Sequence, residues 1–389
     1  MATLLVQPRS RIFHGHEWVY ASDVKEISGA VEPGDVVNLR DTRGRALGSA
    51  IYNPKSQIVA RRFSYRKQEL DAEFFLRRIE RAINFRKSLP IDQRLCRLVW
   101  SESDGLPGVV VDRYGDHVVL QTLTLAMAQR QELISQALNE LLRPKSIIAR
   151  NDAPVRKAEG LEQEKTVLLG QAPPPFQIQS NKLIFQVDLM EGQKTGLYLD
   201  QLDNYAHVAR YAKGRRVLDC FTNQGGFAQA CALAGAREVI AVDVSEAAVN
   251  MTLQNARAAG VAIGARVDNV FDYLSSAERA GEKFDLIVLD PPSFTKTKQS
   301  LKDATRGYKE IHLRAMKMLE PGGILATFSC SHHVTTGDFR MIINSAAVDT
   351  KTTMRYLTTY GQRSDHPVIT GIPETEYLRG YALEMMGGW

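Results

Sequence analysis

The 389-residue chain has little of what marks a membrane or secreted protein. No apolar run is long enough to span a bilayer, and Gln7, Arg9 and Arg11 interrupt the apolar character that a secretory leader would show after Met1. Cysteine is scarce, and the four residues stand far apart without a C-x-x-C pair or a nearby histidine pattern (Cys96, Cys220, Cys231 and Cys330). We therefore expect a cytoplasmic protein with no membrane partner, no disulfide framework and no metal site.

The dinucleotide fingerprint G-x-G-x-x-G is also missing, and there is no internal repeat or low-complexity tract. The first absence weighs against NAD or FAD, so an NAD-dependent oxidoreductase is only a distant alternative. With 44% hydrophobic and 24% charged residues, the composition is that of a globular protein, and the length predicts two or three domains. We place them at residues 1–70, 71–180 and 181–389.

The first segment alternates short apolar runs with turn signals, which predicts a small, mostly β barrel. It holds eleven Lys or Arg against seven Asp or Glu, and so carries +4 of the chain's net charge of +5. Four basic residues crowd its end and suit a phosphate backbone: Arg61, Arg62, Arg66 and Lys67. The alternative is an ordinary solvated face.

The second segment opens with the helical spacing of residues 71–87. A hairpin over residues 109–121, a helix over 128–142 and strands at 146–149 and 166–169 follow, giving a small strand, strand, helix, strand, strand module. The prolines at 173–175 mark its end.

The third segment alternates strands and helices, which implies a mainly parallel sheet; closing strands near 354–359 and 377–385 would complete seven. Its first strand runs into a glycine turn and a helix within residues 215–227, and the next strand ends in Asp243. Glycines let a backbone approach a ligand, and a strand-end acid can accept from ribose hydroxyls, so this is a nucleotide-binding unit.

Polar residues follow four strands of this sheet and meet at its carboxyl edge: Asp219 with its glycines, Asp243, Asp268 with Asn269, and Asp290 with Pro291 and Pro292. In this order they resemble the seven-stranded α/β methyltransferases that use S-adenosylmethionine. The resemblance implies that Asp243 binds the ribose and that Asn269, with Asp268 beside it, contacts the adenine amine. It also implies a cofactor turn made of Asp219, Phe221, Gly225, Gly226 and Phe227, although Asn223-Gln224 departs from the usual residues before the glycines.

The Asp290-Pro291-Pro292 run lies, by the same resemblance, where the methyl group meets its acceptor. Followed by an aromatic residue it is typical of nitrogen methylation on bases, but here Ser293 precedes Phe294. The alternative is a rigid loop after a buried strand.

Cys330 follows another buried strand and reaches the same edge. Carbon 5 of a pyrimidine is a poor nucleophile, and adding a thiolate to carbon 6 makes it attack a methyl donor. Asp290 can bond or protonate ring nitrogen 3. The alternative is a small buried thiol in the core.

Taken whole, the chain resembles the ribosomal RNA large subunit methyltransferase I family, the 5-methylcytosine methyltransferases of 23S RNA. The matching runs are residues 101–108, 194–201, 290–294, 329–331 and 365–368. The family implies an RNA-binding barrel of PUA type, a central α/β insert and a catalytic domain, with Cys330 as nucleophile and Tyr198 and Asp200 near the cofactor. Other cytosine methyltransferases carry a cysteine where this chain has Ser293.

We expect an S-adenosylmethionine-dependent methyltransferase that acts on carbon 5 of a cytosine in large-subunit ribosomal RNA. Residues 194–201 would form a lid near the cofactor, or else a helix with a solvated lysine. Base-nitrogen methylation without a covalent step and an inert RNA-binding assembly factor are the alternatives. A homodimer is compatible with the sequence, which identifies neither the target nucleotide nor the group that releases the product.

Overall fold

The computed structural model describes residues 1–294, 301–331 and 333–386. They form two compact units. The first unit comprises Met1–Phe176, Val187–Leu199 and Ser364–Thr375, and the second comprises Gln177–Gln186, Asp200–Arg363 and the chain from Glu376 onward. None of the helices in these described ranges has both the length and the apolar composition needed to cross a membrane.

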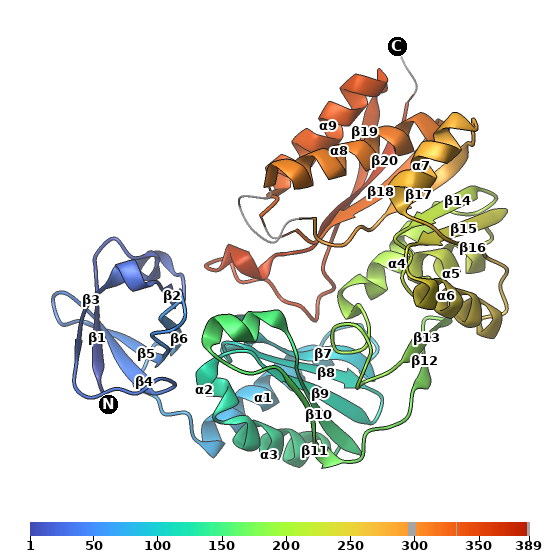
Figure 1. The fold of residues 1–389 in the computed structure, drawn as a ribbon. Helices are drawn as coiled ribbons and strands as arrows, with labels where there is room; N and C mark the ends of the chain where they lie inside the picture. Colours follow the sequence, from blue (N-terminus) through green and yellow to red (C-terminus); the bar gives the residue numbers. More distant parts are fainter. Residues whose placement is uncertain (295–300, 332, 387–389) are drawn as a thin grey trace. The chain divides into compact units, whose positions relative to one another are not determined.

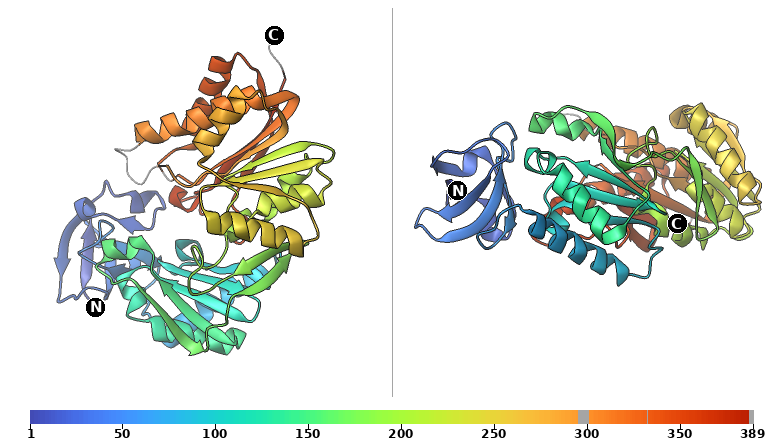
Figure 2. Two further views of the ribbon diagram at one scale, coloured as in Figure 1. Left: turned by 45° about the vertical axis from the view of Figure 1, so that its right-hand side comes forward. Right: turned by 90° about the horizontal axis from the view of Figure 1, so that it is seen from below.

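The first unit begins with the predicted β domain, a six-stranded sheet in the order β2-β6-β5-β4-β1-β3, drawn in blue in Figure 2. Apolar side chains at alternate positions, such as Leu4 and Val6 on β1 or Val37 and Leu39 on β4, fill its interior. The strands are β1 (Thr3–Val6), β2 (Trp18–Val19), β3 (Val24–Ser28), β4 (Val36–Asp41), β5 (Ala46–Tyr52) and β6 (Ala60–Ser64).

The rest of the first unit is a five-stranded sheet, in the order β11-β10-β9-β8-β7, with three helices. Its core takes in Phe74 and Phe75 of α1 together with Val36, Ile51 and Phe63 of the barrel, so the two sheets share one interior. The elements are α1 (Ala72–Lys87), β7 (Leu95–Trp100), β8 (Val109–Tyr114), β9 (His117–Thr122), α2 (Leu125–Ala128), α3 (Gln131–Leu142), β10 (Ser146–Asn151) and β11 (Glu164–Gly170).

Two features of this module differ from the sequence prediction. Strand β7 was not predicted, because Arg97 interrupts its apolar run; the Arg97 guanidinium is buried against the carboxylate of Asp112 on β8, with two N–O distances of 2.8 Å. The single helix expected over residues 128–142 is two helices, α2 and α3.

Residues 364–375 return to the first unit and are fixed there by Arg86 of α1. This guanidinium is fully buried and donates to Asp104 Oδ1 (2.6 Å) and to the backbone carbonyl of Asp365 (2.8 Å). The Asp365 carboxylate in turn accepts from the backbone N–H of Arg97 (2.8 Å) and contacts the His366 ring. The 365–368 run therefore has a structural role in holding the first unit together.

The second unit is built on a seven-stranded sheet in the order β16-β15-β14-β17-β18-β20-β19, which confirms the predicted number of strands. The first five are parallel, and β20 is antiparallel to both of its neighbours. The strands are β14 (Arg216–Cys220), β15 (Glu238–Asp243), β16 (Gly264–Val267), β17 (Phe284–Leu289), β18 (Leu319–Ser329), β19 (Met354–Gly361) and β20 (Arg379–Met385). A two-stranded hairpin that the sequence did not predict, β12 (Phe176–Ser180) and β13 (Leu183–Val187), precedes them.

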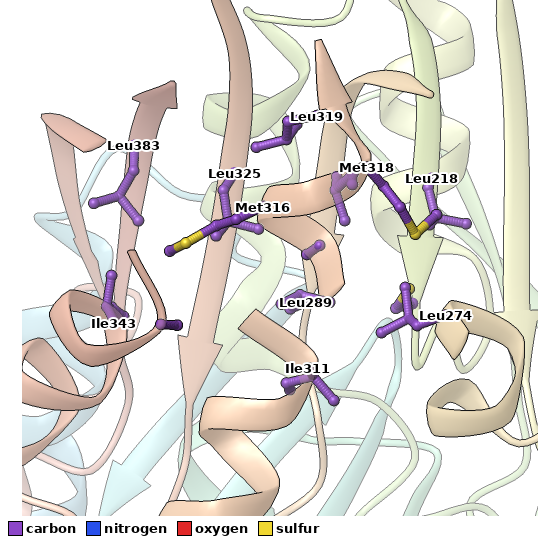
Figure 3. Packing of buried hydrophobic residues seen from close by; sticks show 14 of the residues in the cluster. Leu218, Leu274, Leu289, Ile311, Met316, Met318, Leu319, Leu325, Ile343 and Leu383 are labelled. Carbon is purple, nitrogen blue, oxygen red and sulfur yellow. The ribbon is translucent and has the colours of Figure 1, made fainter. Parts of the chain in front are cut away.

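Helices cover both faces of this sheet, α4 to α6 on one and α7 to α9 on the other (Figure 1). Leu218, Leu289 and Leu325 of the strands pack against Ile311 and Met316 of α8 and against side chains of α7 and α9 (Figure 3). The helices are α4 (Leu202–Ala209), α5 (Gly226–Leu233), α6 (Glu246–Ala258), α7 (Val270–Arg279), α8 (Leu301–Met318) and α9 (Thr336–Thr350). Because β14 to β18 are parallel, their carboxyl ends meet at one edge, where ligands bind in open α/β sheets.

Candidate cofactor and catalytic site

The turn after β14 has a backbone that few residues can adopt. Phe221, Asn223 and Gly225 all have positive φ, at 62°, 50° and 78°. At Gly226, the first residue of α5, a Cβ atom would lie 2.4 Å from the ring of Tyr205. The close approach makes glycine necessary at 226 and leaves the amino end of α5 facing the sheet edge.

Asp219 is buried beneath this turn at the end of β14. One carboxylate oxygen, Oδ2, accepts from Thr222 Oγ1 (2.5 Å) and from the backbone N–H of Ala228 (3.1 Å). The other, Oδ1, is buried and has no hydrogen-bond partner among the described residues. Burial, with a smaller contribution from the charge of Asp243, raises the pKa of Asp219 to about 7, although its two hydrogen bonds act in the opposite direction. A buried acceptor without a donor suits a cationic ligand group.

Asp243, at the end of β15, is oriented by two backbone donors. Its Oδ2 accepts from the N–H of Asn223 in the turn (3.0 Å), and its Oδ1 accepts from the N–H of Ser245 (2.9 Å). Each carboxylate oxygen can accept a second bond, which is the arrangement that a pair of ribose hydroxyls needs.

At the end of β16, Asp268 and Asn269 have different roles. Asn269 is the N-cap of α7, and its Oδ1 accepts from the N–H of Phe271 (2.9 Å). The Asp268 carboxylate is half-buried, and its backbone N–H donates to the carbonyl of Asp243 (3.0 Å). The structure therefore uses the Asn269 carbonyl to start a helix and leaves Asp268 as the better acceptor for an adenine amine.

This row of acceptors fits S-adenosylmethionine. Asp219 offers an unsatisfied oxygen to an ammonium group, Asp243 offers two oriented oxygens to hydroxyls, and the Gly225-Gly226 turn leaves no side chain between the ligand and the sheet.

Asp290 follows β17 and is held by a glutamine to which sequence reasoning assigned no role. Gln201 is buried; its Nε2 donates to Asp290 Oδ2 (3.1 Å), and its Oε1 accepts from Asn204 Nδ2 (2.7 Å). Asn204 also donates to the carbonyl of Gly361 (2.9 Å). A chain of amides thus sets the orientation of the Asp290 carboxylate. The only sequence signal was the position of Gln201 at the end of the 194–201 run.

Cys330 follows β18, and its Sγ lies 3.9 Å from the carbonyl oxygen of Pro291, the residue after Asp290. It is half-buried, whereas the other three cysteines are buried. Burial raises the pKa of the Cys220 and Cys231 thiols above their ordinary value, and the charge of Asp219 adds to the effect, which makes both unreactive. Cys330 is the one cysteine of the four that is not buried.

Hydroxyl groups join the loops that carry Asp290 and Cys330. Ser293 Oγ and Ser331 Oγ are 3.1 Å apart, and Tyr308 of α8 contacts Ser331 Oγ (2.9 Å) and accepts from Ser329 Oγ (2.9 Å). Burial raises the pKa of Tyr308 to about 12, so its hydroxyl keeps its proton at neutral pH. Ser293 is part of the link between the two loops.

Comparisons with known proteins identify the family of the chain. Residues 163–359 match the family model of S-adenosylmethionine-dependent methyltransferases, and residues 7–65 match that of PUA-like domains. The ribosomal RNA large subunit methyltransferase I of Erwinia tasmaniensis is 41% identical over 95% of this chain and 96% of its own length, and that of Yersinia pestis is 38% identical over the same shares. The chain belongs to the ribosomal RNA large subunit methyltransferase I family.

Two solved structures share the fold. A SAM-dependent methyltransferase from Streptococcus mutans has a TM-score of 0.84 at 22% identity, covering 99% of this chain and all of its own. A methyltransferase complexed with S-adenosylhomocysteine has a TM-score of 0.85 at 23% identity, with the same coverage. This member of the family is thus an S-adenosylmethionine-dependent methyltransferase with a PUA-like amino-terminal domain.

The run that contains Tyr198 and Asp200 divides between the two units. In the second unit, Asp200 Oδ2 accepts from Tyr377 Oη (2.6 Å). In the first, Tyr198 Oη donates to Gln193 Oε1 (3.0 Å), and Thr195 is buried, with its Oγ1 donating to Asp112 Oδ2 (2.6 Å). Residues 194–198 form no helix, and the buried bond of Thr195 works against a freely moving lid; the lid stays a prediction.

The four basic residues expected to contact RNA in this family member do not form one surface. Arg61 Nη1 lies 2.7 Å from Glu102 Oε1, and Arg62, buried, lies 2.5 Å from Glu17 Oε2. Both guanidinium groups are engaged in pairs inside the first unit, and contact with phosphates stays a prediction for all four residues. Arg66 and Lys67 are exposed.

Proposed function

We propose that this protein transfers a methyl group to carbon 5 of a cytosine in large-subunit ribosomal RNA, with Cys330 as a covalent nucleophile. The observation that carries the proposal is the reachable Cys330 thiol, 3.9 Å from the Pro291 carbonyl and therefore beside Asp290. The curated relatives, which are named for large-subunit ribosomal RNA, support the substrate. Such a substrate implies a cytoplasmic enzyme. The homodimer stays a prediction.

Cys330 acts first in this proposal. Its thiol gives a proton to solvent, and the thiolate forms a bond to carbon 6 of the cytosine, which moves an electron pair onto the ring and makes carbon 5 nucleophilic. The Asp290 carboxyl, oriented by Gln201, bonds to ring nitrogen 3 and stabilises the pair there.

S-adenosylmethionine supplies an electrophilic methyl group on a positively charged sulfur. In our proposal Asp219 holds the ammonium group of this cofactor, Asp243 its ribose hydroxyls and Asp268 its adenine amine. Tyr198 and Asp200 stay as expectations near the cofactor. After carbon 5 is methylated, its proton passes to a base or to water, the carbon–sulfur bond breaks and Cys330 leaves as thiolate, which restores the aromatic ring.

The RNA would be held mainly through its phosphates, by Arg66 and Lys67 rather than by Arg61 and Arg62. The target base has to leave any stack or pair to reach Cys330.

The chemistry is tested with unmodified large-subunit RNA, methyl-labelled S-adenosylmethionine and nucleoside mass spectrometry. We expect label in 5-methylcytosine from the wild type, none from Cys330→Ala, and unchanged cofactor binding in both. Cys96→Ala, which removes a buried cysteine of the first unit, is the matched control and should stay active. RNA containing 5-fluorocytidine should trap a covalent complex with the wild type and with Cys96→Ala but not with Cys330→Ala, because carbon 5 then carries fluorine in place of the proton that must be removed before the carbon–sulfur bond breaks.

A fully active Cys330→Ala variant would refute the covalent step. Label in a methylated purine would favour the second candidate, base-nitrogen methylation by the Asp290-Pro291-Pro292 loop. The supporting observation is this run with the aromatic Phe294 near it, separated from Pro292 by Ser293. Binding of RNA without any binding of S-adenosylmethionine would point to an inert assembly factor.

A further inference from the structure

The first unit contains a cavity of about 400 Å³ that none of the roles above uses. Its wall is formed by the end of β6 with Tyr65, by the outer face of α1 with Arg78, Arg81 and Phe85, and by two connecting segments at residues 102–105 and 367–369. The volume falls in the range of small-ligand sites, roughly 300–1,000 Å³. All of these residues belong to the first unit.

Tyr65 presents an aromatic face that is fixed before any ligand arrives. The ring is 69% exposed, yet the guanidinium of Arg62 lies 4.0 Å from its centroid, and its hydroxyl donates to Glu17 Oε1 (3.1 Å). Arg62 is itself held by the other oxygen of Glu17. One face of the ring is therefore backed by a cation and the rest is open, which makes a rigid platform for stacking at little entropic cost.

The charges of the cavity leave an excess of two cations. Its three acids are neutralised, since Glu17 pairs with Arg62, Glu102 with Arg61 and Asp104 with Arg86. Arg78 and Arg81 have no acidic partner in the part of the chain that the structure describes. Arg78 Nη2 donates to the carbonyl of Phe63 (3.1 Å), and burial, together with the charges of Arg81 and Arg77, lowers the pKa of Arg78. An anion between Arg78 and Arg81 would relieve this crowding of positive charge.

Gly105, in the 101–108 run, explains how Arg78 reaches the cavity. Its φ is +69°, and a Cβ atom there would lie 2.9 Å from Arg78 Nη1. A larger residue would push the guanidinium out, so the glycine keeps a cation next to the aromatic platform.

We propose that this cavity binds one unpaired nucleotide of RNA, with its base stacked on Tyr65 and its phosphate at Arg78 and Arg81. Single-stranded RNA is recognised by this combination of aromatic faces and guanidinium groups. The inference rests on the proposed RNA substrate but not on cytosine chemistry, since it assigns a holding site in the first unit and leaves the reacting base to Cys330.

Equilibrium binding of a labelled eight-nucleotide single-stranded RNA to the full chain, without cofactor, tests the proposal. Tyr65→Ala and Tyr65→Leu should weaken binding about tenfold, because both remove a stacked base, and the leucine keeps bulk against Arg62. Arg81→Ala should reduce the slope of log affinity against log salt by about 0.7. Arg43→Ala, which removes an exposed arginine of the barrel outside the cavity, should change neither value.

Unchanged melting temperature and S-adenosylmethionine affinity would show that each variant is folded. The proposal is wrong if both Tyr65 variants bind RNA like the wild type. It is also wrong if only Arg81→Ala weakens binding, because that would mean a phosphate site without a stacked base. Binding of an acidic aromatic peptide to the cavity without binding of RNA would likewise refute it. Loss of RNA binding in the Tyr65 variants without any 5-methylcytosine from the wild type would retain the cavity and reject the proposed chemistry. If instead the wild type makes 5-methylcytosine and the Tyr65 variants bind RNA normally, the proposed chemistry stands and the cavity proposal is rejected.

Discussion

Cofactor affinity should depend on pH through Asp219, because the carboxyl that would hold the ammonium group of S-adenosylmethionine is protonated in the free protein below neutrality. Burial raises the pKa of Asp219 to about 7. Binding a cation next to the unsatisfied Oδ1 requires the ionised form, so a protonated Asp219 has to release its proton when the cofactor binds.

The size of the effect follows from the ionised fraction. With a pKa of about 7, roughly 3% of Asp219 is ionised at pH 5.5 and about half at pH 7. The dissociation constant of the cofactor should therefore be about 15-fold larger at pH 5.5 than at pH 7. Close to one proton should be released per cofactor bound at pH 5.5, and about half a proton at pH 7.

Isothermal titration calorimetry in two buffers of different ionisation enthalpy measures both quantities. Asp219→Asn should bind the cofactor weakly at both pH values, because its amide donates where the ligand also donates. Asp268→Asn should lose affinity but keep the pH dependence, since Asp219 is intact. A wild-type dissociation constant that changes less than twofold between pH 5.5 and 7, or an Asp219→Asn variant with the wild-type slope, would refute the reasoning.

The same group should affect folding stability. A carboxyl whose pKa is higher in the folded than in the unfolded protein stabilises the fold below the unfolded value of 3.8 and loses that contribution as pH rises through about 7. The loss amounts to at most about 4 kcal/mol. Asp219→Asn should therefore gain free energy of unfolding relative to the wild type between pH 5 and pH 8, as measured by urea titration.

Two further predictions concern packing. Gly226→Ala should lower the free energy of unfolding by about 1–3 kcal/mol and weaken cofactor binding, because its Cβ atom would meet the Tyr205 ring. In the control Gly337→Ala the new Cβ atom has only Thr335 Oγ1 nearby, at 3.7 Å, so the free energy of unfolding should change by less than about 1 kcal/mol. Equal urea midpoints for the two variants would contradict this. Arg97→Ala should lower the free energy of unfolding by about 3–5 kcal/mol, because it leaves the buried Asp112 carboxylate without a cationic partner. Arg94→Ala, at an exposed pair with Asp92, should lower it by about 0–1 kcal/mol. Comparable losses in chemical denaturation would mean that burial does not set the cost.

The sequence alone was sufficient for the succession of strands β14 to β18 along the chain and for the edge at which the polar residues that follow them meet. Glycines at 225 and 226, the acid at 243 and the Asp290-Pro291-Pro292 run are local signals, since turn geometry and strand length depend on neighbouring residues. The parallel sheet then follows from the alternation of strands and helices, and β14 to β18 occur where the pattern indicates.

Only the tertiary structure decided which of these groups are free to act. Gln201 orients Asp290 from 89 positions away, Tyr308 of α8 bonds to the serines on either side of Cys330, and Arg61 and Arg62 turn inward to acids that the sequence did not connect with them. Strand β7 could not be predicted because the partner that lets Arg97 be buried lies on another strand. Burial and pairing arise between segments distant along the chain, so local spacing carries no record of them, and they set both the charge of Asp219 and the positions of the cations that face solvent.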